Sequence, residues 1–215
     1  MTDRELFARV DHTLLKADAR EEDIRKICEE AVTYSTASIC INPGYIDYAA
    51  SILKGRIPIC TVIGFPLGAM TTESKVFEAK DAVRRGADEV DMVINISKAK
   101  DHDYAYVENE IRAVKEAVGD HILKVIIETC LLTDEEKIRL CGCVISAGAD
   151  FIKTSTGFST GGATFHDVEL FKEHCRGKCR IKAAGGIRTR EDMEKFIQLG
   201  ADRLGTSSAV RILRG

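Results

Sequence analysis

Short apolar runs alternate along the chain with longer segments whose apolar side chains recur every three or four positions. The runs are rich in isoleucine and valine and show little polar alternation, which is typical of strands buried on both faces of a parallel sheet. Seven runs fit this description, and a shorter eighth, Arg9–Asp11, follows a predicted N-terminal helix. The seven predicted strands are Ala37–Ile41, Ile57–Ile63, Glu89–Ile94, Leu123–Ile127, Asp150–Lys153, Arg180–Ala184 and Arg203–Gly205.

The segments between these runs carry the start and stop signals of helices. Thr2 and Glu5 have the spacing of a capping box, and so do Thr133 and Glu136. Other cap residues and terminating glycines mark further helix ends. We expect helices at Ala19–Tyr34 after Asp18, from Pro43 to Lys54, at Glu73–Arg85 after Thr72, at Asp103–Val118, from Thr133 to about Ala147, from Thr164 to about Arg176, at Arg190–Leu199 after Thr189, and at Ser207–Leu213.

The tripeptide Gly-Ala-Asp occurs three times, each time between a helix and a strand. The copies begin at Gly86, Gly148 and Gly200, which are 62 and 52 residues apart. Two strand–helix units of about 26 residues fill each interval, so the pattern predicts one α/β domain over residues 1–215, a (β/α)8 TIM barrel with a short N-terminal helix. A doubly wound open sheet is the alternative, but Asp11–Lys16 is not the glycine-rich loop that usually follows its first strand.

Composition excludes several classes of function. Lys and Arg number 31 against 34 Asp and Glu, and the net charge of −3 argues against a nucleic-acid partner. The chain has no run of 18 apolar residues and no apolar core near Met1, so we expect a cytoplasmic protein without a membrane partner. Its eight cysteines are then expected to be buried thiols. Neither the Cys141–Cys143 pair nor the Cys175–Cys179 pair has zinc-site spacing, and we expect no metal.

Two lysines stand at the ends of neighbouring predicted strands. Lys153 ends one strand and Lys182 lies in the next, and barrel enzymes carry their reactive groups at the carboxyl ends of strands. Adjacent strands are about 4.8 Å apart, so charge repulsion and desolvation both favour a neutral amine. A neutral lysine amine attacks carbonyl carbon. The pair predicts Schiff-base chemistry, and a structural pair with acidic partners is the alternative.

Acidic residues near these strands are candidate partners. Asp91 lies inside an apolar strand, where a carboxylate is costly unless it is paired, and it is a candidate acid/base. A buried salt bridge would also explain Asp91, and the two roles can coexist. Asp11 is a second, weaker candidate acid/base because its strand is short, and Lys124 is a candidate charge partner. Cys40 is a candidate for the substrate pocket, although a core thiol is the favoured interpretation.

Small and hydroxyl-bearing residues follow the last three predicted strands. Barrels often hold phosphate with the loops after strands seven and eight and the start of a short helix. A turn alone would explain any one of these segments. Glycine-containing segments after both of the last two predicted strands, where barrels often bind phosphate, favour a phosphate site. Arg188 is a candidate source of positive charge. The expected phosphate-binding residues are Thr156, Gly157, Gly185, Gly186, Ser207 and Ser208.

The chain resembles the deoxyribose-phosphate aldolase family, whose members are class I aldolases with a TIM barrel. The resemblance spans nearly the whole chain in order, and the combination of Lys153-Thr-Ser-Thr-Gly with Lys182-Ala-Ala-Gly-Gly is highly specific. The matching segments are Asp11–Leu15, Ser38–Pro43, Thr61–Gly68, Glu89–Asn95, Leu123–Thr129, Asp150–Gly157 and Ile181–Arg188.

The resemblance implies an activity and a set of roles. Lys153 would form the Schiff base. Lys182 would favour the neutral amine of Lys153 and help proton transfer. Asp91 would donate and accept protons, with Asp11 and Lys124 in the surrounding network. The implied reaction is reversible cleavage of 2-deoxy-D-ribose 5-phosphate to acetaldehyde and D-glyceraldehyde 3-phosphate, in deoxyribonucleoside catabolism. No cofactor or metal is implied, because the protonated imine is the electron sink. The partners are then a sugar phosphate, aldehydes and further copies of the chain, as a homodimer or homotetramer.

Two departures from the family pattern bear on the site. Phe158 stands where some members carry a basic residue, and the chain ends at Gly215 without the terminal tyrosine tail of some members. The residues alone also leave two other functions open. One is a different phosphate-binding barrel enzyme, such as an isomerase, and the other is a sugar-phosphate sensor without catalysis.

Overall fold

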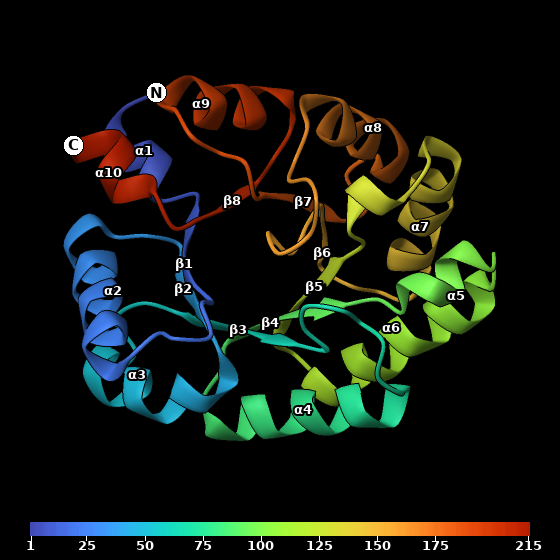
Figure 1. Cartoon of the computed structure of the whole chain (residues 1–215), viewed down its shortest axis with the longest axis horizontal. Coiled ribbons are helices and arrows are strands. Elements are labelled where there is room, and N and C mark those ends of the chain that lie inside the picture. The colour runs from blue at the N-terminus through green and yellow to red at the C-terminus, as the bar shows by residue number, and fades with distance from the viewer.

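Eight parallel strands close into a barrel in chain order. A computed structural model describes all of residues 1–215, and β1 pairs with both β2 and β8 in it. Figure 1 shows the strands in the middle and the helices around them. The closed barrel confirms the predicted fold and excludes the doubly wound sheet. The strands are β1 Val10–Leu14, β2 Ser38–Ile41, β3 Ile59–Ile63, β4 Glu89–Val93, β5 Ile122–Ile126, β6 Phe151–Lys153, β7 Arg180–Ala184 and β8 Arg203–Thr206.

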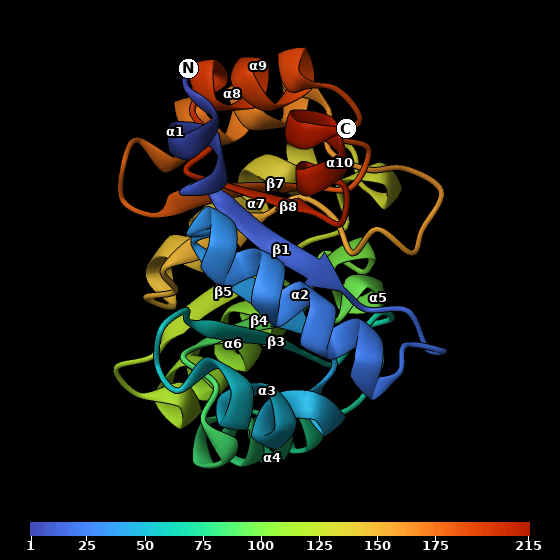
Figure 2. The ribbon, with the colours of Figure 1, turned by 90° about the vertical axis from the view of Figure 1, so that its left-hand side faces the viewer.

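A ring of helices covers the barrel, and a short N-terminal helix precedes β1. Figure 2 shows that helix beside the last one, near both chain ends. Asp3 ties it there through ion pairs with Arg190 at 2.6 Å and Arg214 at 3.2 Å. No helix combines the length and apolar composition that crossing a membrane requires. The helices are α1 Asp3–Phe7, α2 Glu21–Tyr34, η1 Pro43–Tyr45 (3-10), α3 Ile46–Leu53, α4 Thr72–Arg85, α5 Ile96–Lys100, α6 Tyr104–Val118, η2 Thr129–Leu131 (3-10), α7 Asp134–Ser146, α8 Phe165–Cys175, α9 Arg190–Leu199 and α10 Ala209–Arg214.

The predicted capping boxes at Thr2 and Thr133 are confirmed. Thr189 caps α9 as predicted and also forms a capping box with Asp192, and Thr164 caps the helix predicted to start there. Several boundaries were predicted wrongly. Strand β1 ends at Leu14 rather than Asp11, and β3 begins at Ile59 rather than Ile57. Helix α2 begins after Arg20 rather than Asp18, and the segment from Pro43 divides into η1 and α3. Helix α4 is capped by Thr71, one residue earlier than predicted, and α10 begins two residues later than predicted. Helix α5 was missed, although Asn95 caps it by accepting from the Lys98 N–H.

The main core lies between the outer faces of the strands and the inner faces of the helices. It is one cluster of 49 buried apolar residues, whereas the barrel interior holds only a small apolar cluster of Leu15, Cys40, Cys60 and Val62 beside Phe65. On β4, for example, Val90 and Met92 belong to the main core. Side chains alternate along a strand, so the intervening residues of β4 enter the barrel. The barrel interior therefore contains buried charged side chains, among them Glu89 and Asp91.

A buried ion pair outside the barrel fixes the loops that follow β3 and β4. Lys75 Nζ lies 2.7 Å from Glu110 Oε1, and both side chains are fully buried. The second oxygen of Glu110 accepts the Asn95 N–H at 2.9 Å. The Lys75 side chain also packs against the backbone at Gly64, where a Cβ would lie 2.9 Å from it. This pair links α4 and α6 to the carboxyl ends of two strands.

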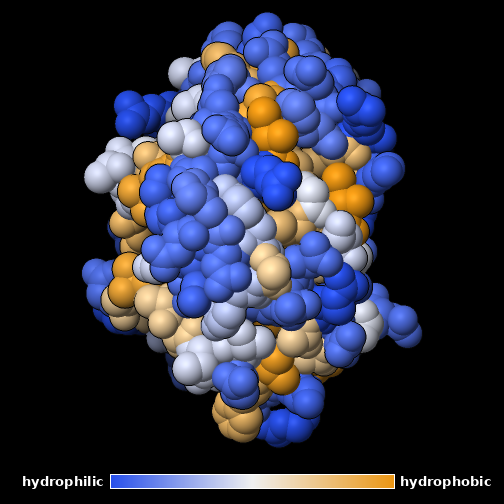
Figure 3. Space-filling view, turned by 90° about the vertical axis from the view of Figure 1, so that its right-hand side faces the viewer, coloured by the Kyte–Doolittle hydropathy of each residue, from blue (hydrophilic) through white to orange (hydrophobic).

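The outer surface is largely polar. Figure 3 shows the face that carries α5, α6 and α7, where hydrophilic side chains predominate and apolar ones appear in separate spots. All eight cysteines are free thiols, and seven of them are buried. This confirms the expectation of core thiols for seven of the eight, whereas the expectation is wrong for Cys130, which is exposed. Burial raises the pKa of Cys28 and of Cys143 to about 11, which keeps these thiols protonated and unreactive at neutral pH.

We expect a thiol reagent such as dithionitrobenzoate to label one cysteine per native chain and eight after unfolding. Cys130 is the exposed thiol and the other seven are buried, so reagent reaches them only when the fold opens. A Cys130→Ser variant is the control and should show no rapid labelling. Rapid labelling of several thiols in the native protein would contradict this account of the core.

Candidate active site

Every strand of the barrel places an ionisable side chain in the interior. All of them except Arg203 are at most 3% exposed. Arg203, the first residue of its strand, is largely buried, with a side chain 14% exposed. Charged groups are this deeply buried only when they are paired. The residues are Asp11 of β1, Cys40 of β2, Cys60 of β3, Glu89 and Asp91 of β4, Lys124 of β5, Lys153 of β6, Lys182 of β7 and Arg203 of β8.

The Asp91 carboxylate is the centre of this cluster. Its Oδ2 lies 2.8 Å from Lys153 Nζ and 2.8 Å from Lys182 Nζ. Its Oδ1 lies 2.8 Å from Lys124 Nζ and accepts a bond from the Cys60 thiol at 3.1 Å. Strand register produces this arrangement, because Asp91 pairs with Lys124 across β4 and β5, and Lys153 pairs with Lys182 across β6 and β7. The four candidates therefore meet at one carboxylate.

Two further carboxylates lie below this centre. Asp11 forms ion pairs with Lys182 and Arg203 and lies 3.5 Å from Lys124. Glu89 lies 2.6 Å from Lys124 and 2.7 Å from Arg203. Sequence reasoning singled out Asp11 and Lys124 but missed Glu89 and Arg203. The available signal was the period of two along β4, which places Glu89 on the same side as Asp91.

These pairings determine the charge of the buried groups. Burial opposes ionisation of Asp91, but the ammonium groups of Lys124, Lys153 and Lys182 outweigh it and hold its pKa well below the usual range. Burial likewise disfavours charge on Lys182, but the carboxylates of Asp11 and Asp91 raise its pKa above the usual range. Lys182 is therefore an ammonium ion. The expectation that repulsion between lysines would favour a neutral amine is wrong for Lys182, because the negative charges of Asp11 and Asp91 stabilise its ammonium form.

The two thiols in the barrel do not form an open metal site. Sulfur of Cys40, sulfur of Cys60 and a carboxylate oxygen of Asp91 lie within 4.8 Å of one another. The same carboxylate already holds three ammonium groups, which a metal cation would have to displace. Cys40 packs in the small apolar cluster and does not line the cavity above it. Its place fits the core interpretation rather than a substrate contact.

A cavity of about 690 Å³ opens above Lys153 at the carboxyl ends of β6, β7 and β8. The N–H groups of Gly186 and Ser207 find no acceptor within the protein, and Arg188 forms no ion pair. The six predicted phosphate-binding residues all line this cavity together with Arg188 and Lys153. They are Thr156, Gly157, Gly185, Gly186, Ser207 and Ser208.

Glycine allows the loops after β6 and β7 to touch. A Cβ on Gly162 would lie 2.5 Å from the Gly185 carbonyl carbon, and Gly185 itself has φ +78°. Glu128 holds the same region from β5, because its carboxylate accepts from both the N–H and the hydroxyl of Thr156. The Thr156 hydroxyl in turn accepts the Phe158 N–H at 3.0 Å. Thr156 thus orders the loop, and its hydroxyl is already engaged.

The whole chain aligns with aldolases. The profile described as DeoC/LacD family aldolase matches residues 6–209. This chain belongs to the DeoC/LacD aldolase family. It is 57% identical over 211 residues to the deoxyribose-phosphate aldolase of Clostridioides difficile strain 630, covering 98% of this chain and 96% of that one. It is 55% identical over 212 residues to that of Finegoldia magna, covering 98% and 100%.

Solved structures show the same barrel. A putative deoxyribose-phosphate aldolase from Coccidioides immitis has a TM-score of 0.96 at 41% identity, covering 99% of this chain and 86% of that one. Deoxyribose phosphate aldolase from Aeropyrum pernix, described as a tetramer, has a TM-score of 0.89 at 34% identity, covering 99% and 91%. The lysine and glycine motifs of this DeoC/LacD aldolase therefore lie in an aldolase framework along its full length.

The mouth of the aldolase cavity has one apolar side. Phe158 follows Gly157, is 53% exposed and lines the cavity. Its ring meets the ring of Phe65 edge to face, with centroids 5.3 Å apart. The structure thus places an aromatic pair where the family pattern allows a basic residue. Besides Lys153, the cationic residues that line the cavity are Lys16, Arg188 and Arg211.

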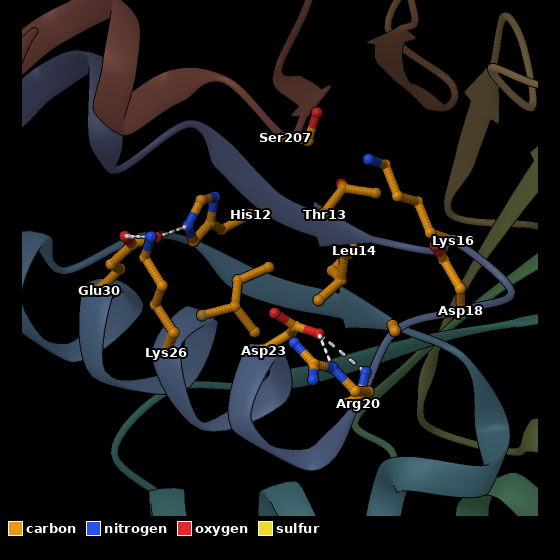
Figure 4. A pocket seen from close by; sticks show the side chains of 12 residues that line it. His12, Thr13, Leu14, Lys16, Asp18, Arg20, Asp23, Lys26, Glu30 and Ser207 are labelled. Atoms are coloured by element: carbon orange, nitrogen blue, oxygen red, sulfur yellow. Dashed lines mark hydrogen bonds and ion pairs between the residues drawn. The ribbon is translucent and has the colours of Figure 1, made fainter.

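A second pocket lies outside the barrel between β1 and α2. It has a volume of about 500 Å³ and shares Thr13, Leu14, Lys16 and Ser207 with the aldolase cavity. Figure 4 shows His12 pointing from β1 towards Glu30 of α2, and their side chains form a 2.7 Å contact. None of the three interior lysines lines this pocket. The cavity above Lys153 is therefore the one of these two pockets that an interior lysine lines.

We expect Asp91→Asn to lower the free energy of unfolding at pH 7 by about 3–5 kcal/mol, because it leaves buried ammonium groups uncompensated. The folded pKa of Asp91 is depressed, so its stabilisation is present above the unfolded value of about 3.9 and is lost as the pH falls. The deficit of the variant should therefore shrink between pH 7 and pH 3. Denaturant unfolding at both pH values measures it.

The exposed Asp120→Asn substitution is the matched control, and its effect should stay within about 0.5 kcal/mol at both pH values. Equal stability of the Asp91→Asn variant and the parent protein at pH 7 would show that this carboxylate does not hold the cluster together.

Proposed function

We propose that the cavity above Lys153 catalyses the reversible cleavage of 2-deoxy-D-ribose 5-phosphate to acetaldehyde and D-glyceraldehyde 3-phosphate through a Schiff base on Lys153. The observation that carries this proposal is the position of Lys153. It lines the cavity together with all six predicted phosphate-binding residues, and it shares one carboxylate with two other lysines. The identity to deoxyribose-phosphate aldolases over nearly the full length of this chain supports the choice of substrate.

Lys153 is the nucleophile that the geometry favours. Lys124 and Lys182 are fully buried and do not line the cavity, whereas Lys153 does. Lys182 has two carboxylates within contact distance and Lys124 has three, but Lys153 has only Asp91. Removing a proton from Lys153 therefore sacrifices the least Coulomb attraction. A neutral amine at this position attacks the substrate aldehyde.

The proposed steps need only proton transfers beyond the lysine. The Lys153 amine adds to C1 of the open-chain sugar, and loss of water gives a protonated imine. Removal of the C3 hydroxyl proton then breaks the C2–C3 bond, and the electron pair moves into the imine to form an enamine. D-glyceraldehyde 3-phosphate leaves, C2 takes up a proton, and hydrolysis releases acetaldehyde. The imine is the electron sink, so the mechanism uses neither metal nor cofactor.

Asp91 and Lys182 are the proposed proton carriers. Asp91 Oδ2 lies 2.8 Å from both Lys153 Nζ and Lys182 Nζ, which is hydrogen-bonding distance for a direct transfer. Lys182 is an ammonium ion and can donate to the carbinolamine oxygen. We assign Asp11 and Lys124 to holding these two groups in place, since they contact them from below.

The phosphate group would lie at the far end of the cavity. We assign the N–H groups of Gly186 and Ser207 to its oxygens, because they are free to donate. Gly157, Gly185 and Ser208 complete the wall, and Arg188 supplies positive charge. Thr156, whose hydroxyl is engaged with Glu128, would shape the wall rather than bind the phosphate. Phe158 would cover the sugar chain instead of the phosphate.

Three properties of the whole protein complete the proposal. Residues 1–215 act as one catalytic domain, and the enzyme works in the cytoplasm in deoxyribonucleoside catabolism. The protein forms a homo-oligomer, a dimer or a tetramer, in keeping with the tetramer described for the Aeropyrum pernix relative. Sedimentation would distinguish these states from a monomer.

Borohydride trapping tests the nucleophile. Reduction in the presence of acetaldehyde or 2-deoxy-D-ribose 5-phosphate should leave one stable adduct, which peptide mass mapping should place on Lys153. Lys153→Met should give no adduct and lose turnover by at least about a thousandfold, while its circular dichroism stays unchanged. An adduct on Lys182 would reverse the proposed roles, and turnover in the Lys153→Met variant would refute the mechanism.

Arg188→Met tests the phosphate end. Loss of one charged hydrogen bond to phosphate costs about 1.5–3 kcal/mol, so KM for 2-deoxy-D-ribose 5-phosphate should rise about tenfold or more. The kcat/KM for unphosphorylated 2-deoxy-D-ribose should stay unchanged. The exposed Arg176→Met substitution, at the residue that follows α8, is the control and should alter neither. Equal losses with both sugars would contradict a phosphate contact for Arg188.

A further inference from the structure

Two buried charged residues take no part in the mechanism above. Glu89 begins β4 and Arg203 begins β8, so both lie at the end of the barrel opposite the cavity. Glu89 Oε1 lies 2.7 Å from Arg203 Nη2, and the second oxygen of Glu89 lies 2.6 Å from Lys124 Nζ. Neither residue lines the cavity. A buried arginine–glutamate pair is costly to desolvate and is weak evidence of stabilisation by itself.

We infer that Glu89 and Arg203 are charge-setting residues, which fix the net charge of the barrel interior and thereby the pH range in which Lys153 acts as a nucleophile. This inference rests on the proposed Schiff-base function of Lys153. Neither residue touches the substrate, and both act through the groups between them and Lys153.

The argument starts from the number of charges that face Lys153. The interior holds three carboxylates and four cationic side chains, so one positive charge is in surplus when every group is ionised. The surplus is relieved when one lysine loses its proton. The groups that face Lys153 from the other strands are Asp11, Cys40, Cys60, Glu89, Asp91, Lys124, Lys182 and Arg203.

An unbroken series of ion pairs links the far end of the barrel to Lys153. Arg203 contacts Glu89, Glu89 contacts Lys124, and Lys124 contacts Asp91, which contacts Lys153, all at 2.6–2.8 Å. Water and salt screen charges poorly in such a buried interior. Lys153 therefore senses a change of charge at Glu89 or Arg203 even though it contacts neither.

The two residues act with opposite sign. Glu89→Gln removes a negative charge, so the interior disfavours an extra ammonium ion and Lys153 becomes neutral at lower pH. Arg203→Met removes a positive charge, so the interior tolerates the Lys153 ammonium ion up to higher pH. Each shift should be about one pH unit. Removing both charges together should return Lys153 to its original behaviour, because the surplus is then the same as before.

The test is the pH profile of kcat/KM for 2-deoxy-D-ribose 5-phosphate in the parent protein, Glu89→Gln, Arg203→Met and the double variant. The acid limb should move down by about one pH unit in Glu89→Gln, up by about one unit in Arg203→Met, and back in the double variant. Arg203→Lys keeps the charge and should keep the parent profile, even if its thermal midpoint falls.

A purely structural ion pair gives a different result. Both single variants would then lose thermal stability and activity together, with acid limbs at the same pH as in the parent protein, and this outcome overturns the inference. If Arg203→Met does not fold, the pH of the acid limb in Glu89→Gln alone tests the inference. Glutamine has nearly the shape of glutamate, so this variant is expected to fold. Borohydride trapping of the parent protein distinguishes failure of this inference from failure of the proposed function. Absence of a Lys153 adduct refutes the proposed function. An adduct on Lys153, together with acid limbs at the parent pH in both single variants, refutes only the charge-setting role.

Discussion

One carboxylate, that of Asp91, holds three lysine ammonium groups in the centre of the barrel. A single aspartate cannot neutralise three cations, so the interior needs the further carboxylates of Asp11 and Glu89. Those two in turn share Arg203. The result is a connected cluster of three carboxylates and four cationic side chains, and the removal of a carboxylate leaves buried positive charge uncompensated.

This cluster explains why a closed barrel suits the chemistry. In a closed barrel the inward side chains of all eight strands converge on one axis, so charged groups from distant segments can contact one another there. The closed barrel buries Lys124 and Lys182 completely and leaves Lys153 at the base of the cavity. The loops above are built for a different task. Gly162 and Gly185 pack backbone on backbone, and this leaves N–H groups available to an anion.

Much of this arrangement could be predicted from local sequence. The predicted strand Arg180–Ala184 coincides with β7, and Thr133 with Glu136 forms the expected capping box at α7. These signals are local, since they depend on neighbouring residues and backbone geometry. Asp91, Lys153 and Lys182 could be singled out for the same reason, because a charged residue within an apolar run stands out in any one segment.

The pairings that join distant segments could not be predicted in this way. Glu89 and Arg203 are 114 residues apart, and each reads as an ordinary polar residue at the start of a strand. The ammonium state of Lys182 depends on Asp11 and Asp91 from two other strands, so a model of two adjacent lysines alone gave the wrong sign. Helix α5 was missed because its five residues are too few to show a period.

The central claim is that the surplus positive charge is relieved at Lys153 and not at its neighbours. The most direct measurement is NMR of protein labelled with 13C at the lysine ε carbons, with Lys153→Met used to assign the resonance of that residue. At the pH of full activity, the Lys153 signal should have the shift of a neutral amine, while the signals of Lys124 and Lys182 keep the shift of ammonium ions. Three ammonium signals at that pH, or a neutral Lys182 beside a charged Lys153, would contradict the account.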